Sequence, residues 1–316
     1  MSFLEQKDFI EENDTVILYL SPSSMHAINV REMMKNKKGE LIEYIFQTSF
    51  GALKVKSLIG VRYGNKVELS RGHAYALQPT PELWTNTLPH RTQIIYTPDI
   101  SMILFQLDVK PGNIVIESGT GSGSLSHHFL RGVKPNGHLF TFDFHEARVE
   151  QAKVEFTNHG VSNFVTVTHR DVIKDGFTEE LNGKADAIFL DLPAPDKAVS
   201  HAFKALKSSG GRFCSFSPCI EQTQKVCEEL QKHGFTEIQS MEILQSEEIV
   251  KMRSVQIMDL DFVRTKKILT TCDIELNDNK KHSKEVQKII TSSAPQILPG
   301  HTGYLTFGTL SPIFAR

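Results

Sequence analysis

Residues 113–124 read Asn113-Ile114-Val115-Ile116-Glu117-Ser118-Gly119-Thr120-Gly121-Ser122-Gly123-Ser124. The apolar run at the start predicts a buried strand, and the glycines predict a tight turn into a helix that begins at Ser124. Glycines at such a turn let a ligand approach the backbone closely, and the helix N-terminus offers free N–H groups. The segment therefore indicates a binding site at the carboxyl end of a strand in an α/β fold.

The spacing of the glycines separates two classes of nucleoside cofactor. Gly119, Gly121 and Gly123 follow the pattern Gly-x-Gly-x-Gly, whereas a nicotinamide fingerprint requires Gly-x-Gly-x-x-Gly. The next predicted strand ends in Phe142-Asp143, so Asp143 stands where an acid grips a ribose diol in either class. The spacing disfavours a nicotinamide oxidoreductase, although Asp143 by itself does not choose.

Alternating strands and helices surround this segment. Such alternation predicts βαβ units on a parallel, doubly wound sheet, so the fold class is α/β over residues 98–316. The predicted strands are 113–117, 138–142, 164–168, 185–190, 212–216 and 303–307, and the predicted helices are 98–107, a helix from 124, 146–159, 198–206 and 221–233.

Two further regions have a different composition. Residues 1–78 carry short apolar runs punctuated by glycines, which predicts a small N-terminal β-barrel-like or sandwich domain. Prolines at both ends of residues 79–97 indicate a connector between domains. Residues 259–300 are rich in Lys, Thr, Ser, Asn and Asp, and we expect a mobile surface insertion because little apolar surface is available to offset the entropy of ordering.

Two other predicted strand ends carry candidate site residues. Asp171 could accept a hydrogen bond from an adenine amine while Val172 forms a wall for the ring, although a helix N-cap is nearly as good a role for Asp171. Asp191 is followed by Pro193 and Pro195, which stiffen the loop and hold a carboxylate at the sheet edge. Asp191 could instead cap the next helix, but Asp196 is better placed for that.

Overall composition limits the class of protein. The 316 residues carry 35 Lys and Arg against 37 Asp and Glu, a formal charge of −2, which argues against a free-standing binder of polyanions. Four cysteines without a CxxC pair predict a reducing, intracellular environment. Residues 1–14 lack an apolar core, and no apolar run reaches spanning length, so secretion and membrane insertion are not expected.

Together these motifs resemble the catalytic subunit of the eukaryotic tRNA (adenine-N1)-methyltransferase family. The resemblance covers nearly the whole chain except the 259–300 insertion. The segments that carry it are residues 116–124, Pro79-Thr80-Pro81-Glu82-Leu83-Trp84, 88–96, Phe189-Leu190-Asp191-Leu192-Pro193-Ala194-Pro195, 211–222 and 301–307.

The resemblance implies a chemistry and an assembly. It implies a seven-stranded, mostly parallel, Rossmann-like methyltransferase sheet, S-adenosylmethionine as methyl donor without a metal, and adenine 58 of the tRNA T-loop as acceptor. It also implies a non-catalytic, tRNA-binding partner subunit, a heterotetramer and a nuclear location. A near-neutral charge then suggests that this subunit does not hold tRNA firmly by itself.

The resemblance also assigns roles to residues. Asp191 becomes the catalytic carboxylate and also contacts the cofactor, and Asp143 holds the ribose. Arg148, by position a surface charge, lines the cofactor site, and Asp171 with Val172 brackets the adenine. The remaining cofactor contacts come from the connector and the glycine turn: Ile95, Gly119, Gly121, Ser122, Gly123 and Ser124.

We hypothesise that Asp191 accepts a hydrogen bond from the exocyclic amine of the target adenine, so that N1 becomes a better nucleophile. The base must leave its stack to reach the site, and Trp84, His90 or Tyr96 could stack on it or simply pack in the connector. Two other classes stay open: a protein methyltransferase of the isoaspartyl type, and an RNA-binding subunit without activity. The Asp191 loop argues against the first, and the intact glycine turn argues against the second.

Overall fold

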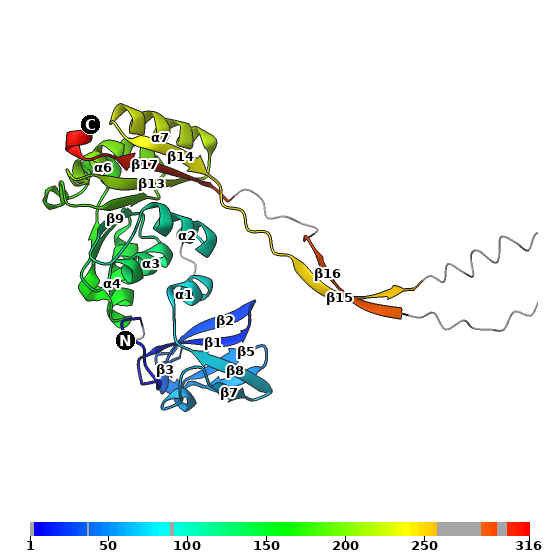
Figure 1. Cartoon of the computed structure of the whole chain (residues 1–316). Coiled ribbons are helices and arrows are strands. Elements are labelled where there is room, and N and C mark those ends of the chain that lie inside the picture. The colour runs from blue at the N-terminus through cyan, green and yellow to red at the C-terminus, as the bar shows by residue number, and fades with distance from the viewer. Residues whose placement is uncertain (1–2, 37, 89–91, 258–285, 296–301) are drawn as a thin grey trace, which may run out of the picture. The chain divides into compact units, whose positions relative to one another are not determined.

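The computed structural model describes residues 3–36, 38–88, 92–257, 286–295 and 302–316 (Figure 1). The chain divides into two compact units. The first comprises Met1–Ile243 with Thr302–Arg316, and the second comprises Leu244–His301. Each unit is described by itself.

The first part of the larger unit consists of short antiparallel strands. One four-stranded sheet has the order β2-β1-β8-β7, and two further hairpins, β3–β4 and β5–β6, form separate sheets rather than one closed barrel. The strands are β1 (Thr15–Ser21), β2 (Ser24–Asn29), β3 (Met33–Lys35), β4 (Leu41–Glu43), β5 (Ile45–Thr48), β6 (Gly51–Lys54), β7 (Lys66–Leu69) and β8 (Gly72–Leu77). The apolar runs at 15–20, 40–46, 52–58 and 66–70 predict strands that overlap β1, β4 with β5, β6 and β7, whereas β2, β3 and β8 were not predicted.

A seven-stranded sheet follows, with the order β11-β10-β9-β12-β13-β17-β14. All pairings are parallel except those of β17, which runs antiparallel to both β13 and β14. This confirms the predicted doubly wound, mostly parallel sheet. The strands are β9 (Ile114–Ser118), β10 (His138–Asp143), β11 (Val165–His169), β12 (Ala187–Leu190), β13 (Gly211–Ser217), β14 (Thr236–Met241) and β17 (Tyr304–Leu310).

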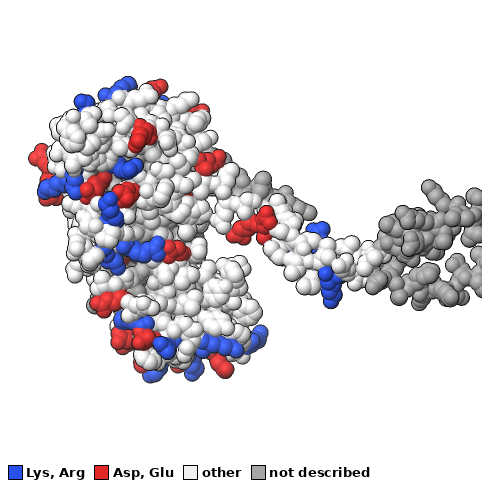
Figure 2. Space-filling view, viewed as in Figure 1, with Lys and Arg blue, Asp and Glu red and all other residues white. Residues whose placement is uncertain are grey.

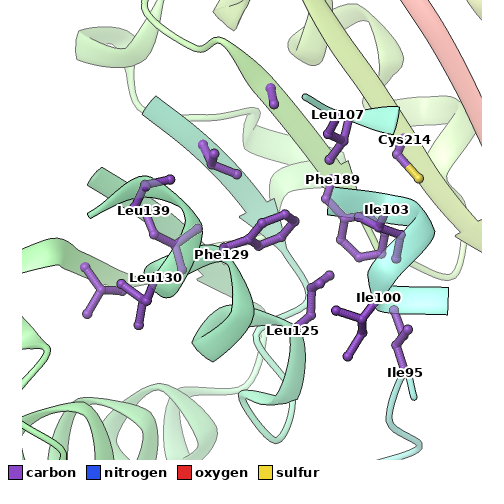
Figure 3. Close-up of a cluster of buried hydrophobic side chains, with 14 of the residues drawn as sticks. Ile95, Ile100, Ile103, Leu107, Leu125, Phe129, Leu130, Leu139, Phe189 and Cys214 are labelled. Atoms are coloured by element: carbon purple, nitrogen blue, oxygen red, sulfur yellow. The ribbon is translucent and has the colours of Figure 1, made fainter. Parts of the chain in front are cut away.

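Helices cover both faces of this sheet (Figure 1). Helices α2, α3 and α4 pack apolar side chains such as Ile103, Phe129 and Phe156 on one face, which Figure 3 shows in part. Helices α5, α6 and α7 pack on the other, through residues such as Ala202 and Leu230. The helices are α1 (Pro81–Thr87), α2 (Thr97–Gln106), α3 (Ser124–Val133), α4 (Glu146–Asn158), α5 (Val172–Asp175), α6 (Val199–Ala205) and α7 (Ile220–Lys232).

Strands β9 and β12 lie side by side at the centre of the sheet, and the chain winds outward in opposite directions from them. The carboxyl ends of two neighbouring parallel strands at such a reversal leave a crevice for a ligand. The segments after β9 and β12 are the glycine turn and the Asp191 loop, so the topology brings the two sequence motifs together.

The smaller unit contains a two-stranded antiparallel hairpin of β15 (Ile249–Gln256) and β16 (Val286–Ser293). Most of the predicted mobile insertion, 259–285 and 296–300, lies outside the described residues. Within its described part, however, residues 286–293 form a strand, because Val286, Ile289 and Ile290 give it β-branched side chains. In the described part of the chain, no helix combines the length and apolar character needed to cross a membrane.

Candidate functional site

The glycine turn begins where β9 ends. Gly119, Gly121 and Gly123 all have positive φ angles, of 103°, 53° and 75°, which favour glycine because a Cβ is strained there. A Cβ on Gly119 would also collide with the backbone carbonyl of Asp191. Glycine at this position therefore lets the turn lie directly against the Asp191 loop.

The connector before α2 is fastened to the same turn. The hydroxyls of Thr92 and Ser122 lie 3.1 Å apart, and the Thr92 N–H donates to the Ser122 hydroxyl over 3.3 Å. The Ser124 hydroxyl donates to the carbonyl of Ile95 over 3.0 Å and is 2.9 Å from the hydroxyl of Thr85. These bonds make the connector one wall of the site. Sequence reasoning did not single out Thr85 or Thr92, because their partners lie about 30 or more residues away in the chain.

Asp143 lies at the end of β10 and is almost buried, with 5% of its surface exposed. One carboxylate oxygen accepts the N–H of Gly121 over 3.0 Å, and the other accepts the N–H of His145 over 2.8 Å. A guanidinium nitrogen of Arg148 lies 3.9 Å from the carboxylate. Two backbone donors and a cation thus hold Asp143 beside the glycine turn.

A cavity of about 610 Å³ opens between these segments. The predicted site residues that line it are Ile95, Gly119, Gly121, Ser122, Ser124, Asp143, Arg148 and Asp191. Three predicted residues do not line it. Gly123 is the N-cap of α3, the Asp171 side chain accepts the N–H of Lys174 as the N-cap of α5, and Val172 is packed in the core on the other face of the sheet.

Asp191 directly follows β12, and its backbone N–H donates to the carbonyl of Ser118 over 2.8 Å. Burial, and then the negative charge of Asp143, raise the pKa of Asp191 to about 6. The loop beyond it is anchored by Gln222, whose amide donates to the carbonyl of Pro193 over 2.9 Å. Asp191 therefore presents a carboxylate to the cavity from a fastened loop, and near neutral pH this carboxylate is mostly ionised.

Glu117 is a cavity residue that sequence reasoning quoted but did not assign. It lies inside β9, is 1% exposed and lines the cavity. Burial raises its pKa to about 8, although the hydroxyls of Ser126 and Thr141 donate to its carboxyl over 2.6 and 2.7 Å. The signal available in the sequence was an acid in an otherwise apolar central strand.

The three aromatic candidates for stacking on a base differ. Trp84 is 6% exposed and packs against Phe3 and His159, so it is a packing residue of the connector. Tyr96 is 44% exposed and remains a candidate. His90 lies outside the described residues.

The chemistry of the cavity suits S-adenosylmethionine. That molecule combines a ribose diol, an adenine, a sulfonium cation and an amino acid group with an ammonium and a carboxylate. It therefore needs hydrogen-bond acceptors, negative charge and a cation for the carboxylate, around a close-fitting backbone. Glu117, Asp143 and Asp191 supply carboxyl groups, and the glycine turn supplies the backbone. We conclude that the residues present fit this cofactor.

Comparison with known sequences points the same way. Residues 72–310 match the family described as the GCD14 subunit of the tRNA methyltransferase complex. The tRNA (adenine(58)-N(1))-methyltransferase catalytic subunit TRM61 of Candida albicans is 45% identical over 249 residues, which cover 77% of this chain and 70% of that protein. The catalytic subunit trmt61a of Dictyostelium discoideum is 37% identical over 325 residues, which cover 98% and 99%.

Two solved structures share the fold. The tRNA (m1A58) methyltransferase TrmI from Aquifex aeolicus superposes with a TM-score of 0.66 at 20% identity, covering 96% of this chain and 99% of that one. A SAM-dependent O-methyltransferase from Thermotoga maritima gives a TM-score of 0.70 at 24% identity, covering 96% and 95%. At these identities the two structures establish a methyltransferase fold and nothing further.

Proposed function

This chain belongs to the family of the GCD14 subunit of the tRNA methyltransferase complex, and from that membership we propose that it transfers a methyl group from S-adenosylmethionine to N1 of adenine 58 in tRNA. The observation that carries the proposal is the cavity at the sheet edge, where the glycine turn, Asp143 and Asp191 converge. The 45% and 37% identity to catalytic subunits with this activity specifies the acceptor.

Different residues of the cavity would bind different parts of the cofactor. S-adenosylmethionine, when bound, supplies a methyl group on a cationic sulfur. Asp143 would accept hydrogen bonds from the ribose hydroxyls, since its carboxylate is held in place by Gly121 and His145. Ser122, Ser124 and the backbone at Ile95 would contact the rest of the cofactor, and Arg148 would balance the charge of its carboxylate.

Asp191 would act on the acceptor base. N1 of adenine has a free lone pair and no proton when it attacks, so the reaction needs no general base at N1. As N1 bonds to the methyl group, positive charge develops on the ring. The Asp191 carboxylate would accept a hydrogen bond from the exocyclic amine and stabilise that charge in a site shielded from water. The anchored loop would hold the base through Asp191 so that N1 faces the methyl group in line, and holding two reactants in line contributes up to about 7–11 kcal/mol.

We also propose that a partner subunit shares the work, as part of a heterotetramer. Exposed apolar residues on the β15–β16 hairpin, Met252 at 67% and Ile290 at 74% among them, support a protein partner, since an isolated two-stranded hairpin is only marginally stable in water. On the face shown in Figure 2, Lys and Arg are interspersed with Asp and Glu rather than gathered in one field. A partner would then supply part of the positive charge for tRNA. The proposed nuclear location rests on the family resemblance alone.

The proposal is tested by incubating the protein, with and without its partner subunit, with radiolabelled S-adenosylmethionine and unmodified tRNA. We expect label in N1 of adenine 58, and we expect transcripts with guanine at position 58 to stay unlabelled. The Asp191→Ala variant should lose transfer yet bind S-adenosylmethionine nearly as well as the wild type. Label in protein alone would favour the isoaspartyl-type alternative, and wild-type transfer by Asp191→Ala would remove Asp191 from the mechanism.

A further inference from the structure

Two histidines form a buried pair behind the glycine turn. His127 lies on α3 and is 2% exposed, and His159 follows the end of α4 and is 3% exposed. Their Nε2 and Nδ1 atoms, respectively, lie 2.8 Å apart. Neither residue lines the cofactor cavity, so neither has a role in the chemistry proposed above.

The direction of the hydrogen bonds follows from the groups involved. His127 Nδ1 lies 2.6 Å from the carbonyl oxygen of Gly123, and a carbonyl can only accept, so Nδ1 carries the hydrogen. In the neutral ring Nε2 is then an acceptor, and His159 Nδ1–H donates to it. With a neutral His127, the pair forms a directed chain from His159 through His127 to the carbonyl of Gly123.

Gly123 connects this chain to the cofactor site. It has a left-handed conformation with φ of 75°, and its neighbours Ser122 and Ser124 both line the cavity. The Gly123 carbonyl already accepts the backbone N–H of His127 over 3.2 Å, so the imidazole adds a second donor that helps to hold the peptide plane between Gly123 and Ser124.

Aromatic side chains enclose the pair. The Phe3 ring lies 4.4 Å from the His159 ring and 5.0 Å from the His127 ring, and Trp84 meets His159 edge-on at 4.7 Å. Lys134 donates to the carbonyl of Phe3 over 3.0 Å and so holds Phe3 against the histidine pair. Both imidazoles are buried, with a carboxylate oxygen of Glu155 within 4.8 Å of a nitrogen of each ring. In buried surroundings a hydrogen bond is stronger, and its loss costs more, than at the surface.

We propose that His127 is a positioning residue for the glycine turn, and that His159 sets the tautomer of His127. This inference rests on the proposed binding of S-adenosylmethionine in the cavity. His127 donates to Gly123, His159 keeps the other ring nitrogen an acceptor, and the glycine turn is held ready for the cofactor before it binds.

The test compares His127→Asn with His127→Gln in the complex with the partner subunit, using calorimetric binding of S-adenosylmethionine and steady-state kinetics. An asparagine amide nitrogen falls near the place of Nδ1, whereas a glutamine amide nitrogen falls near that of Nε2. We expect the Asn variant to bind within about threefold of the wild type, and the Gln and Ala variants to bind about tenfold more weakly. The kcat at saturating cofactor should change little.

If His127 only filled space, the Gln variant would bind the cofactor better than the Asn variant, because glutamine is closer to histidine in volume. A Gln variant that binds like the wild type, with an Asn variant that binds like Ala, overturns the proposal. Combining His127→Ala with His159→Ala should add little to the loss in His127→Ala, since both act through one bond to Gly123. Additive losses would contradict the directed chain.

His233 provides a matched control. Its Nδ1 lies 2.9 Å from the carbonyl of Glu229, the residue four positions earlier on α7, which repeats the His127–Gly123 geometry away from the glycine turn. His233→Ala should leave cofactor binding unchanged, and an equal loss there would indicate general destabilisation. Trp84, the only tryptophan in the chain, reports by its fluorescence whether each variant keeps the enclosed cluster.

One other use of the cluster is tested in the same samples. His127, Glu155 and His159 could together hold a metal ion, because one ligand atom from each lies within 4.8 Å of the others. Stoichiometric zinc in the purified complex, or a loss of cofactor binding on chelation, would replace the hydrogen-bonded pair with a metal site. A wild-type protein that binds no S-adenosylmethionine would instead refute the proposed function.

Discussion

Three carboxyl groups, Glu117, Asp143 and Asp191, border one cavity and differ in what surrounds them. Asp143 has two backbone donors and a nearby guanidinium, which stabilise its charge. Glu117 is enclosed in the sheet with hydroxyl donors only. The surroundings of Asp191 are intermediate between those of Asp143 and Glu117. Different surroundings thus raise the pKa of Glu117 to about 8 and that of Asp191 to about 6, while Asp143 is held by backbone donors.

The raised pKa of Asp191 predicts a pH dependence of catalysis. The proposed role needs the ionised carboxylate, so protonation near pH 6 should remove the acceptor for the adenine amine. We expect kcat/KM to be level above pH 7, half-maximal near pH 6 and to fall about tenfold per pH unit below it. Initial rates with tRNA across pH 5 to 8 measure this profile. Asp191→Asn should give a low, flat profile, and an unchanged wild-type rate at pH 5 would contradict the assignment.

The pKa of Glu117 predicts a pH dependence of stability. The unfolded chain releases this proton near pH 4.5, whereas the folded chain holds it to about pH 8. The contribution of Glu117 is therefore complete below pH 4.5 and is lost as the pH rises toward 8, amounting to about 3 kcal/mol by pH 7. Glu117→Gln cannot ionise in either state and should lose this slope.

Urea unfolding of the wild type and Glu117→Gln at pH 5 and pH 8 makes the comparison. The variant should gain stability relative to the wild type as the pH rises, and equal changes in both proteins would show that Glu117 ionises normally. Glu82→Gln is a suitable control. Burial would raise the pKa of Glu82, but hydrogen bonds, chiefly from Arg131, lower it to about 2, so its contribution is nearly constant over this range.

At the scale of elements, the sequence predicted six strands of the seven-stranded sheet, including the edge strand β11, and missed only the edge strand β14. β12 is apolar throughout, and β9 is apolar up to Glu117, because both strands are buried in the sheet. Their sequence pattern can therefore be recognised without knowing their partners. β14 has the polar sequence Thr236–Met241 and is mostly exposed. It is a strand because β17 pairs with it, and that partner lies far along the chain. The same contrast holds in the candidate site. The glycine turn is a local pattern and could be predicted, whereas the contacts of Thr92 with it join distant parts of the chain and could not.

Because α7 anchors the Asp191 loop, we predict that breaking this anchor lowers kcat more than it weakens cofactor binding. Gln222 donates to the carbonyl of Pro193 and accepts the N–H of Cys219, so it ties the loop after β12 to the start of α7. Gln222→Leu should leave the loop free to move and lower kcat about tenfold. Gln222 also lines the cavity, but the glycine turn and Asp143 are untouched, so binding of S-adenosylmethionine should change less than kcat.

Steady-state kinetics and calorimetric cofactor binding measure the two effects separately. Gln231 lies nine positions further along α7, so Gln231→Leu makes the same chemical change on the same helix away from the loop and should leave kcat as in the wild type. Unchanged kcat in Gln222→Leu would show that the prolines hold the loop by themselves.

At the scale of the molecule, the β15–β16 hairpin predicts where assembly can be broken. Met252 and Ile290 are direct partners across the two strands, and both are exposed. Changing both to Lys should prevent association with the partner subunit, because charge would replace an apolar contact surface. Cofactor binding should persist, since the hairpin belongs to a separate unit.

Size-exclusion chromatography with the partner, together with calorimetry, tests both expectations. Phe314→Lys is the matched control, because Phe314 is 89% exposed but lies outside the hairpin unit. Normal assembly of the Met252→Lys/Ile290→Lys variant would show that the partner binds another surface. Composition alone did not predict this surface, because the polar residues of 259–300 outnumber the short apolar run that contains Ile289 and Ile290.

The position of β17 has a consequence for how the protein is made. β17 lies between β13 and β14 in the sheet, yet the ribosome produces it after both of them and after the whole of 242–303. At about 5–20 residues per second, the nascent chain spends several seconds with the glycine turn complete and two sheet edges open. Open edges pair readily with other chains. Synthesis of this subunit therefore passes through an interval of exposure in which chaperones would have their main opportunity to act.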